Sequence, residues 1–440
     1  MKKHLILLFI SLSLHSFSQS DLTLEQAITY GLENSHEIAI IKNDAEIIKN
    51  TTHTGAAGVL PNIFISSGYN GAINNVELEI NPFLDFGEDM DSEINASQAQ
   101  SLSMMSSVGL SYRLFNGFSG IYTLKKFKQQ RIIADENTRY QIENKILEII
   151  QQYYDVLNKT NIYNTFATTH SISLERYQQS VEKHEIGAIS KLNLLNAEAN
   201  LNQDKVNMEE ALLSLKASKL NMSLLIGVPD TKITIAHDFK FNNSLNLDTL
   251  LKQTMSNNSS ITMATLNYDV AQYELKIAKS SFSPSVDLIT SYSYNNMQSE
   301  TSFISKQTDR GIVAGVNISI PILSSNMRKK AFQNAKINLD SKNRSLEHIE
   351  ETIKTALVTA YYNYTEGLKN LDLLAKNIET IETTADLNKE LYDMGQISNL
   401  EYRESQVLLD QTRINYSLKL SSIKIQEFII YQLSGQLQTK

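Results

Sequence analysis

The segment GAISKL at residues 187–192 recurs 208 residues later as GQISNL at residues 395–400. The tyrosine pair at residues 153–154 recurs at the same distance, at residues 361–362. So long a period indicates one large supersecondary unit used twice, because solenoid repeats have periods of about 20–50 residues. The sequence therefore predicts a duplicated fold.

The distance between the two copies is longer near the N-terminus. There LTL at residues 22–24 corresponds to LNL at residues 245–247, an offset of 223. The offset changes by 15 residues between Pro61 and Ser111, so the first copy contains a longer excursion at that place. We expect the parts of the chain to be a first repeat at 19–228, a linker at 229–244 and a second repeat at 245–440.

The first 20 residues have the parts of a secretory signal peptide. Lys2 and Lys3 form a basic start, an apolar run extends from Leu5 to Leu14, and residues 16–18 form a small-x-small cleavage site. The apolar run is shorter than the roughly 20 residues that span a bilayer. We therefore expect residues 1–18 to be a signal peptide.

The composition restricts the possible partners and chemistry. Acidic residues outnumber basic ones by 48 to 40, which disfavours a polyanionic partner such as nucleic acid. The chain has no cysteine, which excludes disulfides, thiolate metal ligands and cysteine nucleophiles. After the signal there is no run of about 18 apolar residues, so we expect any membrane crossing to be made by strands.

Residues 121–186 contain neither glycine nor proline and are rich in Lys, Glu, Gln, Leu and Ile. This composition predicts one helix of roughly 100 Å, at about 1.5 Å per residue. Apolar residues at alternating spacings of four and three form a heptad seam. The seam residues are Ile142, Ile146, Ile149, Tyr153 and Val156, and in the second copy Ile349, Ile353, Ala356 and Ala360.

Each long helix is expected to end near a glycine, Gly187 or Gly395, and to be followed by a return helix that a serine caps. The return helices run to about Ile226 and Leu433. A further helix is expected to open each copy. The expected spans of these opening helices are Leu24 to Gly58 and Leu247 to Ser280.

Between the opening helix and the long helix, apolar and polar residues alternate, which is the period of a strand. Each repeat thus supplies one hairpin. The expected strands are about 61–70 and 106–115, and about 284–295 and 310–321. The polar face of Gly, Ser and Asn suits a wet lumen. The tyrosines that suit a membrane interface are Tyr69, Tyr112, Tyr292 and Tyr294.

Four strands are too few to close a transmembrane barrel, whose single-chain minimum is about eight. Open strand edges cannot lie in lipid, so several chains would have to share one barrel. Two chains would give a filled barrel of eight strands, and three would give twelve strands with a lumen. The alternative is a small soluble sheet that packs on the helices.

The excursion Asn70–Gln100 is acidic, and no Lys or Arg occurs from Asn50 to Tyr112. A calcium loop would need the EF-hand spacing, which is absent. We therefore expect a solvated outer loop. Its acidic residues are Glu77, Glu79, Asp85, Glu88, Asp89, Asp91 and Glu93.

The order and spacing of these features resemble the TolC-like outer membrane efflux protein family, the outer membrane factors. The resemblance covers about Leu22 to Gly435 and rests on the signal peptide, the duplicated helix–hairpin–helix–helix unit and the paired Gly-x-x-x-x-Leu turns. It implies a mainly α fold with a small β part and long coiled-coil helices. Four strands per chain would contribute to a trimeric 12-stranded transmembrane β-barrel. An α-helical tunnel would project into the periplasm from the cell outer membrane.

In that family the turns after the long helices form the periplasmic entrance and contact the adaptor. The matching residues of this chain are Gly187, Ile189, Ser190 and Leu192 in the first turn, and Gly395, Ile397, Ser398 and Leu400 in the second.

The resemblance also implies an entrance gate. Tyr392 matches the family's gate tyrosine, but Ile397 stands at the position of its Arg partner and Asn193 at that of its Asp partner. A gate salt bridge of the family's kind is therefore not expected. Glu401 and Glu404 resemble the acidic ring residues of the entrance, and their spacing of three places them on one helix face.

The implied function is that of an outer membrane channel in a tripartite export system, a passive duct for small molecules or type I secretion substrates. The implied partners are two further copies of the chain, a periplasmic membrane-fusion adaptor and an inner-membrane pump of RND or ABC type. No catalytic motif is present, so we expect no enzyme activity, cofactor or metal. The alternative is a periplasmic coiled-coil adaptor or scaffold protein, although adaptors usually have one hairpin flanked by β-rich domains.

Overall fold

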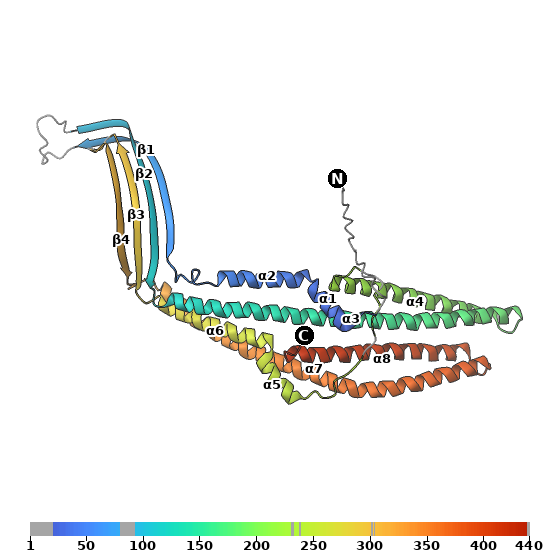
Figure 1. Ribbon diagram of the computed structural model, residues 1–440. Coiled ribbons are helices and arrows are strands. Elements are labelled where there is room, and N and C mark those ends of the chain that lie inside the picture. The colour runs from blue at the N-terminus through green and yellow to red at the C-terminus, as the bar shows by residue number, and fades with distance from the viewer. Residues whose placement is uncertain are drawn as a thin grey trace, which may run out of the picture. The chain divides into compact units, whose positions relative to one another are not determined.

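The computed structural model describes residues 21–79, 93–229, 233–236, 239–300, 302 and 304–437. Long helices and one antiparallel sheet make up the fold (Figure 1). The chain divides into two compact units. The helical unit comprises the segment before Asn43, Asn137–Thr262 and Ile349–Lys440, and the sheet unit comprises Asn43–Glu136 and Met263–His348. The expected signal peptide lies outside the described residues.

The two long helices confirm the predicted duplication. Helix α3 (Ser119–Glu185) and helix α7 (Met327–Asp393) have 67 residues each, and both of their ends differ by 208. The return helices α4 (Lys191–Ile226) and α8 (Asn399–Leu433) begin 208 residues apart. Among the described residues, no helix has both the length and the apolar character that a membrane span requires.

In the first copy the predicted heptad seam lies in the core of the helical unit, whereas Ile349, Ile353 and Ala356 of the second copy are only half-buried and lie outside its core. Ile149 and Val156 are fully buried, and Ile146 and Tyr153 are 3% exposed. Burying such a side chain stabilises the fold by about 1.5–3 kcal/mol. The second repeat has its own smaller core around Leu357, Ala360, Tyr364, Ile423 and Ile430.

The opening helices differ from the expectation of one helix in each copy. The first copy has α1 (Leu24–Glu33) and α2 (His36–Thr51), and the second has α5 (Leu247–Asn257) and α6 (Ser259–Ser280). An asparagine lies at each break. Asn34 Nδ2 donates to Ile226 O at 3.1 Å, and Asn258 Nδ2 donates to Leu433 O at 3.0 Å.

Side-chain hydrogen bonds stabilise the helix ends at both breaks. The last carbonyls of a helix have no partner within the helix. Each asparagine supplies a donor to the final carbonyl of its return helix. The second helix of each pair starts at a side-chain cap, because Ser35 Oγ accepts from Ile38 N and Asn258 Oδ1 accepts from Ser260 N and Ile261 N. The prediction of a single opening helix in each copy was wrong because it did not count Ser35 and Asn258 as caps that start a new helix.

The sheet has four antiparallel strands in the order β1-β2-β3-β4. They are β1 (Asn62–Glu79), β2 (Glu93–Phe115), β3 (Ser285–Ser299) and β4 (Lys306–Ser319). Strands β1 and β4 form its edges. Four hairpin strands per chain were predicted, and four are present in the described residues.

Strands β1 and β2 extend well beyond the predicted 61–70 and 106–115. Much of the expected outer loop is therefore strand: Ile73 pairs with Gln100 and Val76 with Ala96. The prediction counted only strict apolar alternation, whereas the hairpin continues because antiparallel pairing satisfies backbone N–H and C=O groups whatever the side chains are. Residues 80–92, including Asp85, Glu88, Asp89 and Asp91, lie outside the described residues.

The two faces of the sheet differ in polarity, as the alternation predicted. Residues directly opposite each other in neighbouring strands share a face. One such row crosses all four strands as Ile65, Val108, Tyr292 and Ile312. A row on the opposite face is Ser66, Ser107, Ser293 and Gly311.

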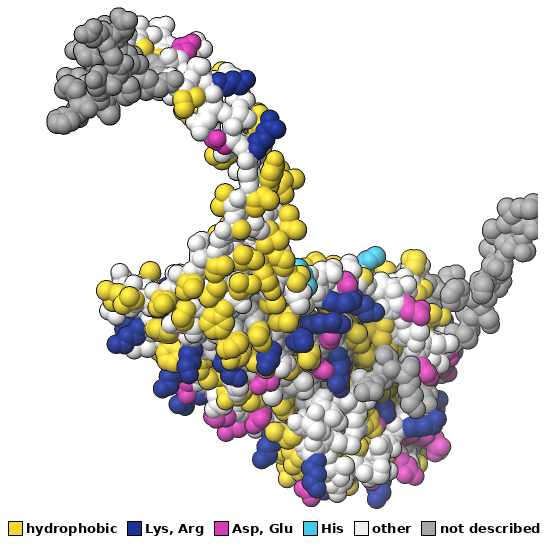
Figure 2. Space-filling view, turned by 60° about the vertical axis from the view of Figure 1, so that its left-hand side comes forward, with side chains coloured by type: hydrophobic (Ala, Val, Ile, Leu, Met, Phe, Trp, Pro, Cys, Tyr) yellow, Lys and Arg dark blue, Asp and Glu magenta, His cyan; other side chains and the backbone are white. Residues whose placement is uncertain are grey.

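The apolar face of the sheet is uncovered. Ile65 is 79% exposed and Ile312 is 76% exposed. Figure 2 shows hydrophobic side chains gathered over part of the strands. Exposed apolar surface of this extent is rare on a soluble monomer and marks contact with a membrane or another protein.

Candidate functional site at the helical tips

Both long helices end in the same hydrogen-bonded turn. Gly187 N donates to His184 O at 2.9 Å, and Ala188 N donates to Lys183 O at 2.8 Å. The second turn repeats this pattern around Gly395. It is the Schellman motif, which requires a left-handed residue. The φ angles are +75° at Gly187 and +72° at Gly395, which explains glycine at both turns.

We call residues 186–193 the first tip and residues 394–401 the second tip. Each return helix starts at a capping serine: Ser190 Oγ accepts from Asn193 N at 3.2 Å, and Ser398 Oγ accepts from Glu401 N at 3.3 Å. Such a cap stabilises a helix start by about 1 kcal/mol. The predicted site residues of each tip are thus brought together by one turn and one cap.

Glu401 completes a reciprocal capping box in the second tip only. Its Oε2 accepts from Ser398 N at 2.7 Å and from Ser398 Oγ at 2.8 Å. The bond from the backbone N–H, and then the hydroxyl bond, lower the pKa of Glu401. Glu404 is exposed one turn further along α8. The Glu401 carboxylate therefore serves as part of the helix cap at this tip.

The tips present apolar side chains to solvent. Ile186 is 80% exposed, Leu192 66%, Met394 67% and Leu400 67%. Ile189 and Ile397 are half-buried. Apolar residues rimmed by polar ones characterise surfaces that bind another protein.

Tyr392 lies two residues before the second tip. Its ring stacks on that of Tyr402, with centroids 5.2 Å apart and planes inclined by 19°. The Arg176 guanidinium of α3 lies 4.7 Å from the Tyr402 centroid and 5.5 Å from that of Tyr392. A cation over an aromatic face contributes about 0.5–2 kcal/mol. Tyr392 thus contacts Tyr402 and Arg176 in this structure.

Arg176 also joins α3 to α8 by a hydrogen bond. Its Nη1 donates to Gln406 Oε1 at 2.8 Å, and Gln406 Nε2 donates to Tyr402 OH at 3.2 Å. Arg176 is 8% exposed, and this burial lowers its pKa. The plane of the guanidinium and its Nη1 are therefore engaged, whereas its buried Nε has no hydrogen-bond partner among the described residues.

Asp204 and Arg403 form a second link, between α4 and α8. Arg403 binds both carboxylate oxygens, with Nη1 2.6 Å from Asp204 Oδ2. Ser173 of α3 donates to the same carboxylate. Asp204 is 2% exposed, so the pair is shielded from solvent.

These contacts join both helical hairpins within about four helical turns of the tips. All four long helices of the helical unit contribute. We call the joining residues the cross-hairpin cluster: Ser173, Arg176, Asp204, Tyr392, Tyr402, Arg403 and Gln406.

Most of this cluster was missed from the sequence. A signal exists in the places where the two copies differ: at the offset of 208, Asp204 corresponds to Thr412, Arg403 to Leu195 and Arg176 to Thr384. Charged residues that only one copy carries form the links between the copies.

The second repeat matches a family model described as outer membrane efflux protein, over residues 250–436. The chain is also similar to outer membrane protein TolC of Escherichia coli (strain K12), with 20% identity over 315 residues. That alignment covers 68% of this chain and 63% of the relative, so the chain spans less than two thirds of that protein. TolC of Vibrio cholerae serotype O1 is 20% identical over 425 residues, which are 94% of this chain and 90% of the relative.

The fold is similar to that of solved outer membrane channels. The CmeC outer membrane channel of Campylobacter jejuni superposes with a TM-score of 0.77 at 17% identity. The superposition covers 94% of this chain and 87% of the other. At this identity the likeness establishes the fold.

Proposed function

Because the chain belongs to the TolC-like outer membrane efflux protein family, we propose that it is the outer membrane channel of a tripartite export system. It acts as a passive duct for small molecules or for type I secretion substrates. Its location is the cell outer membrane, with a large periplasmic part. The observation that carries the proposal is the sheet, which has one apolar face, one polar face and two long edge strands.

The edge strands require partners. Both β1 and β4 are longer than ten residues, and their outer N–H and C=O groups cannot remain unpaired in lipid. Copies of the chain that pair β1 with β4 satisfy both edges. Three copies give twelve strands, with the row of Ile65 toward lipid and the row of Ser66 toward a wet lumen.

The tips supply the periplasmic entrance. Their exposed apolar residues dock a membrane-fusion adaptor, which connects the channel to an inner-membrane pump of RND or ABC type. The pump provides the energy, and the channel contributes a route and a gate.

The cross-hairpin cluster keeps the entrance closed. Opening requires the second hairpin to move away from the first, and this movement separates Arg176 from the Tyr392–Tyr402 stack and Arg403 from Asp204. A cluster of this kind takes the place of the salt bridge whose positions hold Ile397 and Asn193. Glu401 and Glu404 then give the open entrance its preference for cations.

The coiled-coil adaptor alternative is not favoured. An adaptor would need one helical hairpin, whereas this chain has two equivalent hairpins, and the relatives to which it is similar are outer membrane proteins.

Two measurements test the proposal. Membrane fractionation of the native host should place the full chain in the outer membrane, and its mass in mild detergent should be that of three copies. In planar bilayers the purified chain should form conducting pores. A stable monomer or dimer, or a chain confined to the soluble periplasm, would overturn the proposal.

A further inference from the structure

The helices that meet the sheet carry basic residues and no acidic ones where they adjoin it. Helix α3 follows β2, α6 precedes β3 and α7 follows β4, so these helix ends lie at one end of the antiparallel sheet (Figure 1). Residues 119–134, 275–286 and 327–339 contain neither Asp nor Glu. We call the basic residues of these stretches the collar: Lys125, Lys126, Lys128 and Arg131 on α3, Lys276 and Lys279 on α6, and Arg328, Lys329, Lys330 and Lys336 on α7.

The acidic residues that flank the α6 stretch do not neutralise the collar. Glu274 accepts from Asn338 Nδ2 of α7 at 3.2 Å and lies 4.0 Å from Lys126 Nζ of α3, so the three helix ends pack together. Asp287 of β3 accepts from Arg113 Nε of β2 at 2.8 Å. Among the described residues, Lys126 is the only member of the collar that forms an ion pair. The other positive charges of the collar therefore lack a carboxylate partner within the described chain.

The helix starts make this concentration of positive charge unfavourable. The N-terminus of a helix carries a partial positive charge, which favours Asp and Glu in the first turn and disfavours Lys and Arg. Neither α3 nor α7 has an acidic residue in its first turn. Helix α7 instead places Arg328, Lys329 and Lys330 there. The helices gain nothing from this arrangement by themselves, whereas a negatively charged partner would relieve the repulsion.

Exposed apolar side chains adjoin the collar. Ile121 is 48% exposed and shares a helix face with Lys125 and Lys128, which follow it by four and seven residues. Phe282 is 50% exposed and lies three residues after Lys279. Figure 2 shows Lys and Arg side chains next to the hydrophobic surface at the foot of the strands. The other large apolar residues exposed at this end of the sheet are Phe118, Ile322, Leu323 and Met327.

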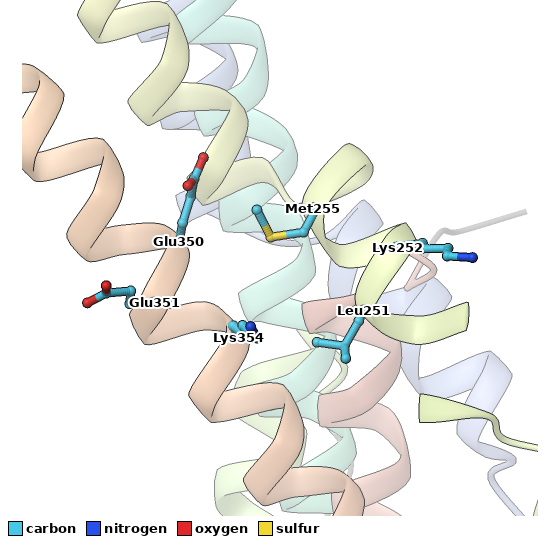
Figure 3. Close-up of a pocket in the computed structure, with 6 residues that line it drawn as sticks. All are labelled: Leu251, Lys252, Met255, Glu350, Glu351 and Lys354. Atoms are coloured by element: carbon cyan, nitrogen blue, oxygen red, sulfur yellow. The ribbon is translucent and has the colours of Figure 1, made fainter. Parts of the chain in front are cut away.

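Lysines of the helical unit are placed differently. Lys252 and Lys354 line a pocket of about 600 Å³, and Glu350 and Glu351 line the same pocket (Figure 3). Charges of both signs thus share that surface, whereas each stretch of the collar carries one sign only. The collar therefore departs from the mixed charge that this chain shows around the pocket.

We propose that the collar binds the phosphate groups of anionic phospholipids in the leaflet that faces the helices. This inference rests on the proposed function, because it takes the sheet as the part that spans the membrane. The partner is a lipid because the surface joins cations to exposed apolar side chains that continue the apolar face of the sheet. Free phosphate would leave those apolar side chains in water, whereas a phospholipid covers them with its acyl chains and reaches the cations with its phosphate.

The spacing along α3 agrees with the depth of the headgroups. Polar headgroups add about 5–7 Å on each side of a hydrocarbon core of about 30 Å. Lys125 and Lys128 lie roughly 6 and 11 Å beyond Ile121 at about 1.5 Å per residue, and these are upper limits to their depth whatever the inclination of α3. Lysine can lay its methylene stem along apolar surface and extend its ammonium toward the phosphates. Both lysines therefore reach the headgroup layer when Ile121 contacts acyl chains.

Lipid retention by the full chain tests the proposal. The protein in mild detergent is incubated with phosphatidylglycerol, which carries a net negative charge, or with phosphatidylcholine of the same acyl chains, which carries none. The lipid that co-elutes with the protein in size exclusion is extracted and quantified by mass spectrometry. The collar variant combines Lys125→Glu with Lys279→Glu. The control variant combines Lys191→Glu with Lys389→Glu, two exposed lysines of the helical unit whose replacement changes the charge by the same amount.

We expect the unmodified chain to retain at least threefold more phosphatidylglycerol than phosphatidylcholine. The collar variant should lose this preference, and the control variant should keep it. Lys125→Arg with Lys279→Arg should also keep it, because the positive charge remains. Raising the salt from about 0.1 M to about 1 M shortens the screening length from roughly 10 Å to 3 Å and should remove the preference in the unmodified chain.

Three results would overturn the proposal: equal retention of the two lipids by the unmodified chain, a preference that survives in the collar variant, or the same loss in the control variant. Displacement of phosphatidylglycerol by inorganic phosphate would show that the collar binds free anions and not lipid. The elution volume separates this inference from the proposed function. A trimer without lipid preference refutes the collar alone, whereas a monomer refutes the shared assembly.

Discussion

The guanidinium of Arg403 on α8 binds both carboxylate oxygens of Asp204 on α4, across the two repeats and away from solvent. The copies do not share this pair, because Leu195 and Thr412 occupy the corresponding positions. The ion pair therefore stabilises the packing of one repeat against the other and is not part of the fold that both repeats share.

Removing Arg403 alone should be costly. Arg403→Leu leaves Asp204 buried without its cation, and breaking a buried pair from one side costs about 3–5 kcal/mol. Thermal unfolding followed by circular dichroism should show the loss. The control is Arg403→Leu with Asp204→Thr, which installs what the other copy carries and should be markedly more stable than the single variant. Equal stability of the single and the double variant would show that Arg403→Leu does not leave the Asp204 carboxylate buried without a partner.

Weakening the stack should open the entrance. Arg176→Lys keeps the charge but loses the planar guanidinium that lies over both tyrosine rings and donates to Gln406. We expect a higher open probability in planar bilayers than for the unmodified chain. Lys183→Gln, which changes a cation 5.8 Å from the Tyr392 ring alone, serves as the milder control. A larger rise in open probability for Lys183→Gln than for Arg176→Lys would show that Arg176 is not the residue that holds the entrance closed.

The entrance should prefer cations, and Glu404 should contribute most of the cation selectivity that a substitution can remove. Glu404→Gln removes an exposed carboxylate in each copy without touching the capping box. The reversal potential in a salt gradient should move toward zero. Glu401→Gln should also reduce selectivity, but it should in addition loosen the start of α8. Unchanged reversal potentials in a variant that combines Glu401→Gln with Glu404→Gln would assign the selectivity filter to other residues.

The pH dependence of that selectivity follows from the cap. Hydrogen bonds from Ser398 lower the pKa of Glu401, so its charge, and the helix stability linked to it, are present above the ordinary carboxyl pKa and are lost as pH falls through the lowered value. In Glu404→Gln channels, the remaining cation preference should therefore persist below pH 4.5, the ordinary value. Loss of the cation preference at or above that pH would mean that Glu401 is not hydrogen-bonded to Ser398 in the open channel.

The tip glycines should tolerate only residues that accept a left-handed backbone. At Gly395 an added Cβ would meet nothing within 4 Å, so the obstacle is the φ of +72° and not a clash. Gly395→Val should cost roughly 1–2 kcal/mol and impair adaptor docking, and Gly395→Asn should stay near normal. Accumulation of a panel of dyes and antibiotics in host cells that carry each variant measures export. Normal export with Gly395→Val at normal expression would place docking elsewhere.

The parts of the fold with a short-range cause were predictable. The glycine-free run at 121–186 predicted α3 to within two residues at each end. The glycine turns and serine caps at the tips follow from local geometry, which six residues suffice to specify. The alternation in β1 to β4 predicted the two faces of the sheet.

The parts with a long-range cause were not predictable. The Asn34 side chain binds a carbonyl at residue 226, and the Asp204 carboxylate binds an arginine 199 positions away. A sequence pattern carries no direct mark of such pairs. The sequence did show that Asp204, Arg403 and Arg176 have no charged counterparts in the other copy. This difference indicates a contact between the copies only when the packing of α4 and α8 is known.

The equal length of α3 and α7 restricts how such a chain can change in evolution or by engineering. Each added residue turns everything beyond it by about 100° around the helix axis. One insertion in the middle of α3 would rotate the seam at Ile149 and the cluster at Arg176 out of step with each other. The 15 residues by which the copies differ all lie between Pro61 and Ser111. Natural insertions, tags and grafted sequences are therefore best tolerated in the β1–β2 hairpin, where a change of length does not rotate the helices.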